Sequence, residues 1–138
     1  MSTSYVESSA LLAWLLGESR SREAIARINK ADIVVTSVLT LLEIERALIR
    51  AERQSMIKAG ECHKLRGTVA GAARSWILME VSEDVRRGAA RVFPIEPVRT
   101  PDAIHLATAL LFVQAFPDLQ VITFDQRIGE NARALGIG

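Results

Sequence analysis

The chain has 138 residues, 49% of them hydrophobic, and its 17 Lys and Arg residues are almost balanced by 16 Asp and Glu residues. That length is enough for one domain with a sizeable core, and a nearly neutral chain is not a polycation that binds nucleic acid through its overall charge. The single cysteine, Cys62, excludes an internal disulfide framework and fits a reducing cytosol. No second Cys/His pair exists to complete a zinc site with Cys62 and His63.

Short apolar strands alternate with helices along the chain. In chain order the pattern predicts strand 4–6, helices 8–17 and 19–29, strand 32–36, helices 37–53 and 56–75, strand 76–81, helices 83–92 and 100–111, strand 119–124 and helix 125–135. Ser8 or Ser9 is expected to cap the first helix and Ser37 the third. This alternation predicts an α/β fold, in which a small parallel sheet lies between helix layers as a three-layer α/β/α sandwich.

The N-terminal residues MSTSYVESS carry no basic region ahead of a long apolar segment, so they do not resemble a signal peptide. The longest apolar run is interrupted by His105 and Gln114 and is too short to cross a bilayer. We therefore expect a soluble, cytoplasmic protein. Because no repeat, low-complexity tract or Pro/Gly-rich linker divides the chain, we expect one domain over residues 1–138.

Four acidic residues are expected at the carboxyl edge of the sheet. Glu7 follows the first strand, Asp125 follows the last, and Asp102 begins a helix whose preceding loop leaves the same edge. Glu43 lies in the first turns of the helix after the second strand, although periodicity alone does not exclude Glu45 in its place. Ligands of open parallel sheets bind at this edge, so the four carboxylates are candidates for one site.

Each of these residues also has a structural interpretation, which is the better one for any of them taken singly. Glu7, Asp102 and Asp125 stand where acids cap helices or complement the helix dipole, and His105 is of a type that usually packs with its hydrogen bonds satisfied.

The presence of four carboxylates at one edge of the sheet, by contrast, favours a metal site. Carboxylates about 5 Å apart repel by roughly 3 kcal/mol at an effective dielectric constant near 20. Oxygen-only ligands favour Mg²⁺ or Mn²⁺, and the matching reaction is hydrolysis of a phosphodiester.

Four segments, in this order, resemble the PIN-domain ribonucleases and in particular the VapC toxins of toxin–antitoxin pairs. They are YVESSALLAWLLGE, TSVLTLLEIERAL, RTPDAIHLATALL and VITFDQRIGENARALGI, which together span almost the whole chain. The resemblance implies a PIN-like, Rossmann-like α/β/α domain whose acidic pocket binds Mg²⁺ or Mn²⁺ and cleaves RNA. It also implies a cognate antitoxin that inserts a C-terminal segment across the pocket.

The resemblance also implies roles for individual residues. Glu43, Asp102 and Asp125 match three acids of the family, and Glu7 occupies the position of the fourth, so these four form the implied catalytic set. The implied metal ligands are Glu7, Asp102 and Asp125. Ser9 and Thr123 match hydroxyl residues that orient carboxylates and water. The side chain of His105, by contrast, is expected to pack beneath the site.

Glu7 departs from the family motif, which ordinarily has an aspartate there. One extra methylene moves the carboxylate by about 1.5 Å, and a misplacement of about 1 Å can cost roughly a hundredfold in rate. Glu7 is therefore consistent with a retuned site, a slower enzyme, or an alternative function as a catalytically weakened PIN-like domain that binds an antitoxin or RNA. A more distant alternative is a Rossmann-like phosphotransferase or phosphohydrolase with Asp125 or Glu7 as nucleophile. It is disfavoured because no lysine follows in a phosphate-holding motif.

Two further features concern partners. Basic residues that can contact RNA phosphates, or can equally form solvated helix faces, are Arg20, Arg22, Arg27, Lys30, Arg50, Arg53, Lys58, Lys64, Arg66 and Arg74. The helix pair of residues 37–75 has LTLLEIERALI on one arm and small residues on the other, namely Gly67, Ala70, Gly71, Ala72 and Ala73. This surplus of apolar and small surface predicts burial against another chain, and in the family that implies a homodimer.

Overall fold

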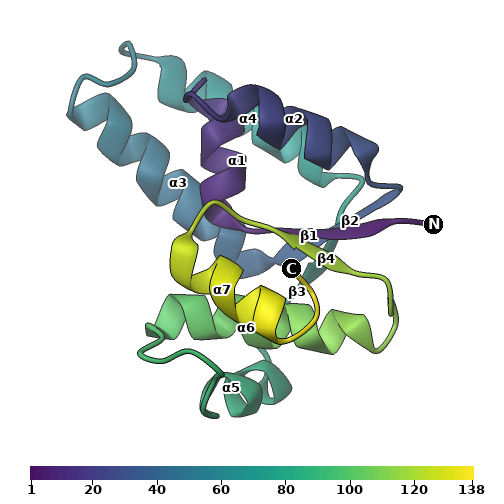
Figure 1. The fold of residues 1–138 in the computed structure, drawn as a ribbon. Coiled ribbons are helices and arrows are strands. Elements are labelled where there is room, and N and C mark those ends of the chain that lie inside the picture. Colours follow the sequence, from purple (N-terminus) through teal and green to yellow (C-terminus); the bar gives the residue numbers. More distant parts are fainter.

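The computed structural model describes residues 1–138 as a four-stranded parallel sheet covered by helices (Figure 1). The strands are β1 (Thr3–Val6), β2 (Ile33–Ser37), β3 (Ile77–Met79) and β4 (Gln120–Ile122). The helices are α1 (Ser8–Leu15), α2 (Ser21–Lys30), α3 (Val38–Arg53), α4 (Glu61–Ala73), α5 (Glu83–Ala89), α6 (Thr100–Val113) and α7 (Gln126–Ala134). The strand order is β3-β2-β1-β4 and every neighbouring pair is parallel. The predicted α/β fold is confirmed.

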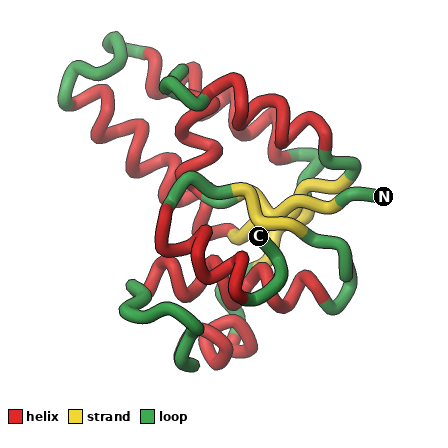
Figure 2. Tube along the Cα trace, in the orientation of Figure 1, coloured by secondary structure: helices red, strands yellow, loops and turns green.

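Two helix layers enclose the sheet. Figure 1 shows α1–α4 on one side of the strands and α5–α7 on the other, and Figure 2 shows the short strands as a thin layer between them. Successive side chains of a strand point to opposite faces. Tyr5 therefore packs in the core with α6 and α7, while Val6 packs in the core with α1 and α3. Burial on both faces explains why β1 is apolar or small at every position.

Local signals set the starts of the helices that carry the site. Ser37 caps α3 by accepting the N–H of Leu39 at 3.0 Å, and Asp125 caps α7 by accepting the N–H of Ile128 at 2.9 Å. Pro101 occupies the first turn of α6, where its missing N–H costs no hydrogen bond. None of the helices is both long and apolar enough to cross a membrane.

Several elements differ from the sequence-based expectation, among them β4 and α5, which are shorter than the predicted residues 119–124 and 83–92. The predicted cap of α1 is wrong, because Glu7 is the N-cap residue and neither of the two serines after it is. Helix α4 begins at Glu61, later than expected, after a turn in which Gly60 adopts the left-handed φ of 88°. Strand β3 is shorter than residues 76–81, and as an edge strand it has two exposed residues among its three.

The parallel register places the ends of β1 and β4 side by side. Val6 is paired with Ile122, and the N–H of Glu7 donates to the Ile122 carbonyl at 3.0 Å. Because both strands run in the same direction, the segments that leave them begin next to each other at one edge of the sheet. This edge positions the candidate site.

Candidate functional site

Four acidic side chains gather beyond the carboxyl ends of β1 and β4. Glu7 follows β1 directly, Asp125 is the N-cap of α7, and Asp102 lies in the first turn of α6. Glu43 comes from the second turn of α3. Burial, and then the charges of Asp125, Glu7 and Glu43, raise the pKa of Asp102 above its ordinary value. The structure thus brings together the four acids that the sequence singled out.

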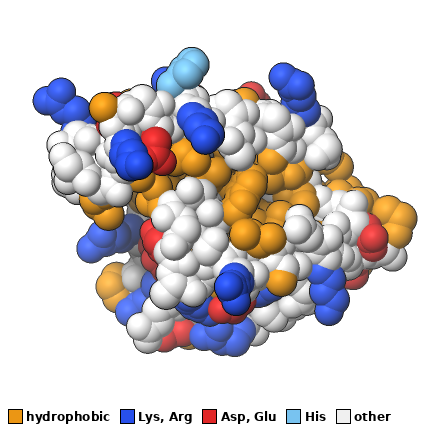
Figure 3. All heavy atoms as spheres, turned by 90° about the horizontal axis from the view of Figure 1, so that it is seen from above, with side chains coloured by type: hydrophobic (Ala, Val, Ile, Leu, Met, Phe, Trp, Pro, Cys, Tyr) orange, Lys and Arg blue, Asp and Glu red, His pale blue; other side chains and the backbone are white.

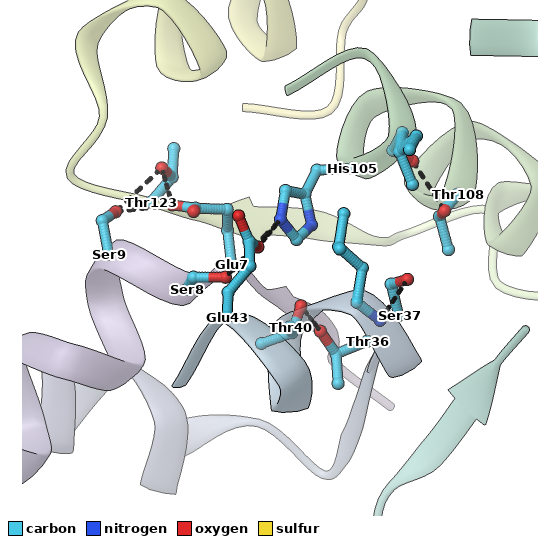
Figure 4. Close-up of polar contacts among 12 residues, drawn as sticks. Glu7, Ser8, Ser9, Thr36, Ser37, Thr40, Glu43, His105, Thr108 and Thr123 are labelled. Carbon is cyan, nitrogen blue, oxygen red and sulfur yellow. Dashed lines mark hydrogen bonds and ion pairs between the residues drawn. The ribbon is translucent and has the colours of Figure 1, made fainter. Parts of the chain in front are cut away.

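The Glu7 carboxylate is held through one of its oxygens. Glu7 is 5% exposed, and its Oε1 accepts hydrogen bonds from Ser9 Oγ at 2.5 Å and from Thr123 Oγ1 at 2.6 Å (Figure 4). Ser9 Oγ in turn accepts the N–H of Phe124, and Thr123 Oγ1 accepts the N–H of Asp125. Each hydroxyl has one proton, and here both protons are directed at Glu7. Ser9 therefore does not cap the helix, and it contacts a carboxylate as the resemblance implied for it and for Thr123.

Glu43 is held in the same manner from α1 and α6. Its Oε1 accepts a hydrogen bond from Ser8 Oγ at 2.6 Å and lies 2.5 Å from His105 Nε2 (Figure 4). Burial raises the pKa of Glu43, but the hydrogen bonds from His105 and Ser8 together bring it below its ordinary value, so the carboxylate is ionised. Glu45, the alternative candidate, pairs with Arg66 at 3.3 Å. Glu43, and not Glu45, therefore lies beside the other acids.

The two aspartates line a cavity of about 500 Å³. Asp125 uses Oδ1 to cap α7, whereas the carboxylate of Asp102 has no hydrogen-bond partner in the protein. Arg99 and Arg127 line the same cavity, and neither of them forms an ion pair with an acid. The cavity thus combines carboxylates that suit a cation with guanidinium groups that suit a phosphate.

The donor atoms of this region suit a hard divalent cation. They are carboxylate oxygens with hydroxyl groups behind them, and the one cysteine lies in the other core cluster, with α1, α3 and α4. As the side chains stand, no three His, Cys, Asp or Glu residues surround one metal position, and Glu7 and Glu43 each direct one oxygen to protein donors. The unpartnered carboxylate of Asp102 and the remaining oxygens of Glu7 and Asp125 are the atoms that could hold Mg²⁺ or Mn²⁺.

Sequence reasoning did not identify the arginines of the cavity. Arg99 lies three residues before Asp102 and Arg127 two residues after Asp125, so nearness to a candidate acid was the signal that could have found them. Of the basic residues named from the sequence, none lines this cavity. The guanidinium of Arg20 stacks at 3.8 Å over the ring of Phe124, the residue before Asp125.

A separate apolar hollow of about 460 Å³ lies among α1, α2, β2 and the end of α4. Both tryptophans of the chain, Trp14 and Trp76, line it together with Ile25 and Ile28. Figure 3, which views the molecule from this side, shows hydrophobic side chains gathered across the middle of the surface. Exposed apolar surface of this kind is typical of protein interaction sites.

Comparison with known proteins adds to this geometry. A family model described as PIN domain matches residues 4–134. Two curated relatives from Mycobacterium tuberculosis align with 96% of this chain: Ribonuclease VapC35 is 33% identical over 132 residues, which are 82% of that protein, and Ribonuclease VapC49 is 29% identical over 139 residues, which are 90% of that protein.

Two solved structures have the same fold. Mycobacterium tuberculosis VapC20, described as a Sarcin-Ricin loop cleaving toxin, aligns with a TM-score of 0.68 at 21% identity over 98% of this chain and 96% of that one. A toxin-antitoxin complex from Klebsiella pneumoniae contains a chain that aligns with a TM-score of 0.63 at 20% identity over 90% of this chain and 88% of that one. At such identities these two likenesses bear on the fold alone.

Proposed function

The chain belongs to the PIN domain family and has VapC ribonucleases as relatives, and on that premise we propose that it is a VapC-type toxin that hydrolyses RNA phosphodiester bonds as a Mg²⁺- or Mn²⁺-dependent endoribonuclease. One observation carries the proposal. Asp102 shares a cavity with Asp125 and has no hydrogen-bond partner in the protein, and burial followed by the charges of Asp125, Glu7 and Glu43 raises its pKa, an arrangement that is costly unless a cation neutralises it. In this proposal residues 1–138 act as one PIN domain on RNA in the cytoplasm.

Three of the acids would hold the ion, namely Glu7, Asp102 and Asp125. When bound, the ion supplies positive charge that shields the scissile phosphate and makes its bound water more acidic. Glu43 keeps Oε2 free of protein hydrogen bonds and accepts a hydrogen bond from the attacking water. Ser9 and Thr123 keep the Glu7 carboxylate in one orientation through their short hydrogen bonds.

The alternative, a weakened PIN-like domain that only binds a partner, rests on Glu7 in place of aspartate. The contacts of Glu7 do not favour it. The extra methylene brings Oε1 to two hydroxyl donors, so the longer side chain is accommodated and restrained, and Oε2 remains without a protein partner.

Arg99 and Arg127 would hold the RNA. They line the cavity of Asp102 and Asp125 without forming ion pairs, and the one protein contact of their guanidinium groups is from Arg127 Nη1 to the Ile95 carbonyl at 3.5 Å, so most of their N–H groups are available for phosphate oxygens. Each neutral substitution at these positions is expected to reduce the salt dependence of RNA binding by about one phosphate contact.

The partner would be a cognate antitoxin that inserts a C-terminal segment across the acidic pocket and lays a further, apolar segment in the separate hollow lined by Trp14 and Trp76. Since these are the only two tryptophans of the chain, a change in intrinsic fluorescence on adding a tryptophan-free antitoxin would report docking directly.

We also propose a homodimer through the α3–α4 pair, where Gly67, Ala70 and Gly71 are exposed and Leu42 is 56% exposed. Sedimentation of the purified chain tests that assembly.

The test of the activity is cleavage of total RNA with Mg²⁺, with Mn²⁺ and with EDTA. Cleavage is expected only with metal and is expected to disappear in Asp102→Asn. Asp118→Asn is the matched control, because it makes the same change at an exposed loop position and should retain activity. RNA that stays intact with either metal and the unaltered chain would overturn the proposal.

A further inference from the structure

His105 is a buried imidazole with both ring nitrogens engaged by the protein. Its ring is 1% exposed, its Nδ1 lies 2.8 Å from the hydroxyl of Tyr5, and its Nε2 lies 2.5 Å from Glu43 Oε1. The rings of Tyr5 and His105 meet edge to face, with centroids 6.0 Å apart and an interplanar angle of 75°. Tyr5 itself is 0% exposed. The ring of His105 is therefore held by a polar contact at each nitrogen and by its packing against the ring of Tyr5.

The contacts assign the proton positions along this chain of groups. An ionised carboxylate only accepts hydrogen bonds, so His105 Nε2 carries the proton that points to Glu43. As a neutral imidazole with that one N–H, His105 presents Nδ1 as an acceptor for the hydroxyl of Tyr5. Burial raises the pKa of Tyr5 far above its ordinary value, which keeps that hydroxyl protonated. The order of donation is thus Tyr5 to His105 to Glu43.

Two donors restrain the same oxygen of Glu43. Ser8 Oγ reaches Oε1 at 2.6 Å from α1, and His105 Nε2 reaches it at 2.5 Å from α6, while Oε2 has no protein partner. A glutamate on a half-exposed helix face otherwise samples several rotamers. Hydrogen bonds to a charged group are stronger than those between neutral groups, so this pair holds the carboxylate with one oxygen anchored and the other free.

We propose that His105, aligned by Tyr5, is a positioning residue that fixes the Glu43 carboxylate, with its free Oε2 available to the acidic site, and that it takes no part in proton transfer. The inference rests on the proposed ribonuclease activity for its kinetic consequence, but the arrangement itself is independent of it. A ring that is 1% exposed and hydrogen-bonded at both nitrogens has no nitrogen left for water or substrate.

A double-mutant cycle tests this role. His105→Leu is expected to lower kcat by about 10- to 100-fold with KM for RNA unchanged, as for other residues that orient a catalytic group. In a Glu43→Ala background the same substitution should have almost no further effect, because there is no carboxylate left to position. Multiplicative losses of kcat in the double variant would overturn the proposal.

Tyr5→Phe removes only the hydroxyl and replaces His105→Leu as the test if that variant fails to fold. It is expected to lower kcat by less than His105→Leu does, and to have no further effect on kcat in a Glu43→Ala background.

A second measurement does not depend on activity. The chain has two histidines, His63 on the surface and His105 in the core, so their imidazole ¹⁵N signals are readily separated. His105 is expected as the fixed Nε2–H tautomer, and Tyr5→Phe should increase the Nδ1–H population. A His105 ring that exchanges between tautomers as His63 does, or that carries its proton on Nδ1, refutes the positioning chain. If the unaltered chain fails to cleave RNA while His105 shows the fixed tautomer, the proposed ribonuclease activity is wrong, but the hydrogen-bonded arrangement of Tyr5, His105 and Glu43 is supported.

Discussion

Replacing Asp102 with asparagine is expected to stabilise the metal-free protein. Asp102 is partly buried, has no hydrogen-bond partner, and is surrounded by charges that raise its pKa. Removing its charge relieves that repulsion. A pair of like charges at 4 Å costs about 4 kcal/mol at an effective dielectric constant of 20, and solvent screening at a partly exposed site reduces this severalfold. We therefore expect the free energy of unfolding to increase by about 1 kcal/mol. For a chain of this length that raises the midpoint of thermal unfolding by about 3 °C.

Saturating Mg²⁺ is expected to reverse the order of stability. A ligand present at 100 times its Kd adds about 2.7 kcal/mol to the folded state, and the unaltered chain should gain this while Asp102→Asn gains little. The assay is thermal unfolding in EDTA and in a series of MgCl₂ concentrations at neutral pH. Asp118→Asn, the same change at an exposed position, should behave like the unaltered chain in both conditions.

Two results would refute this reasoning. If Asp102→Asn is less stable than the unaltered chain in EDTA, the carboxylates do not repel one another in the folded state, and their charge gives no reason to expect a cation. If both proteins gain equally from Mg²⁺, the ion binds somewhere other than at Asp102.

Three further predictions concern single residues. Glu7→Asp should withdraw the carboxylate from Ser9 and Thr123, which lowers cleavage by about a hundredfold and stability by about 1–2 kcal/mol; cleavage that increases would instead support the weakened-module alternative. Tyr5 is the only tyrosine and its pKa is raised by burial, so the folded state keeps a proton that the unfolded state loses above about pH 10. Stability should therefore fall as the pH rises past that value, and tyrosinate absorbance should appear only together with loss of the circular dichroism of the helices. Leu48→Ala, at a position that is 0% exposed, should cost about 2–5 kcal/mol in denaturant unfolding, whereas an equal effect of Leu42→Ala at its exposed position would contradict the assigned face of α3.

The strands and most helices could be predicted because their signals are local. Ser37 is followed by a helix that it caps, and the strand exits follow from short apolar runs. The start of α4 could not be predicted, because a side chain of the preceding helix determines it. Glu52 Oε1 accepts the N–H groups of Gly60 at 2.8 Å and of Cys62 at 3.2 Å, which closes the turn and caps the new helix. The helix propensities of residues 56–61 cannot reveal a contact with a side chain of the preceding helix.

The acids of the site could be predicted for a similar reason, and their partners could not. A parallel sheet brings the carboxyl ends of its strands to one edge, so the residues that follow the strands lie near each other regardless of which contacts their side chains make. Which donor each carboxylate accepts depends on three-dimensional packing. Ser8 lies 35 residues from Glu43 and His105 lies 62 residues from it, and no spacing in the sequence relates them.

The structure treats its glutamates and its aspartates differently. Glu7 and Glu43 each give one oxygen to two side-chain donors and keep the other free, whereas Asp125 is held by a backbone N–H and Asp102 by no hydrogen bond. A glutamate has one more rotatable bond than an aspartate, so it needs additional donors to reach the same precision of placement. Glu7 is therefore not an isolated departure from an aspartate motif. The carboxylate and the hydroxyls of Ser9 and Thr123 act as one unit, and a substitution of any one of them tests the unit as a whole.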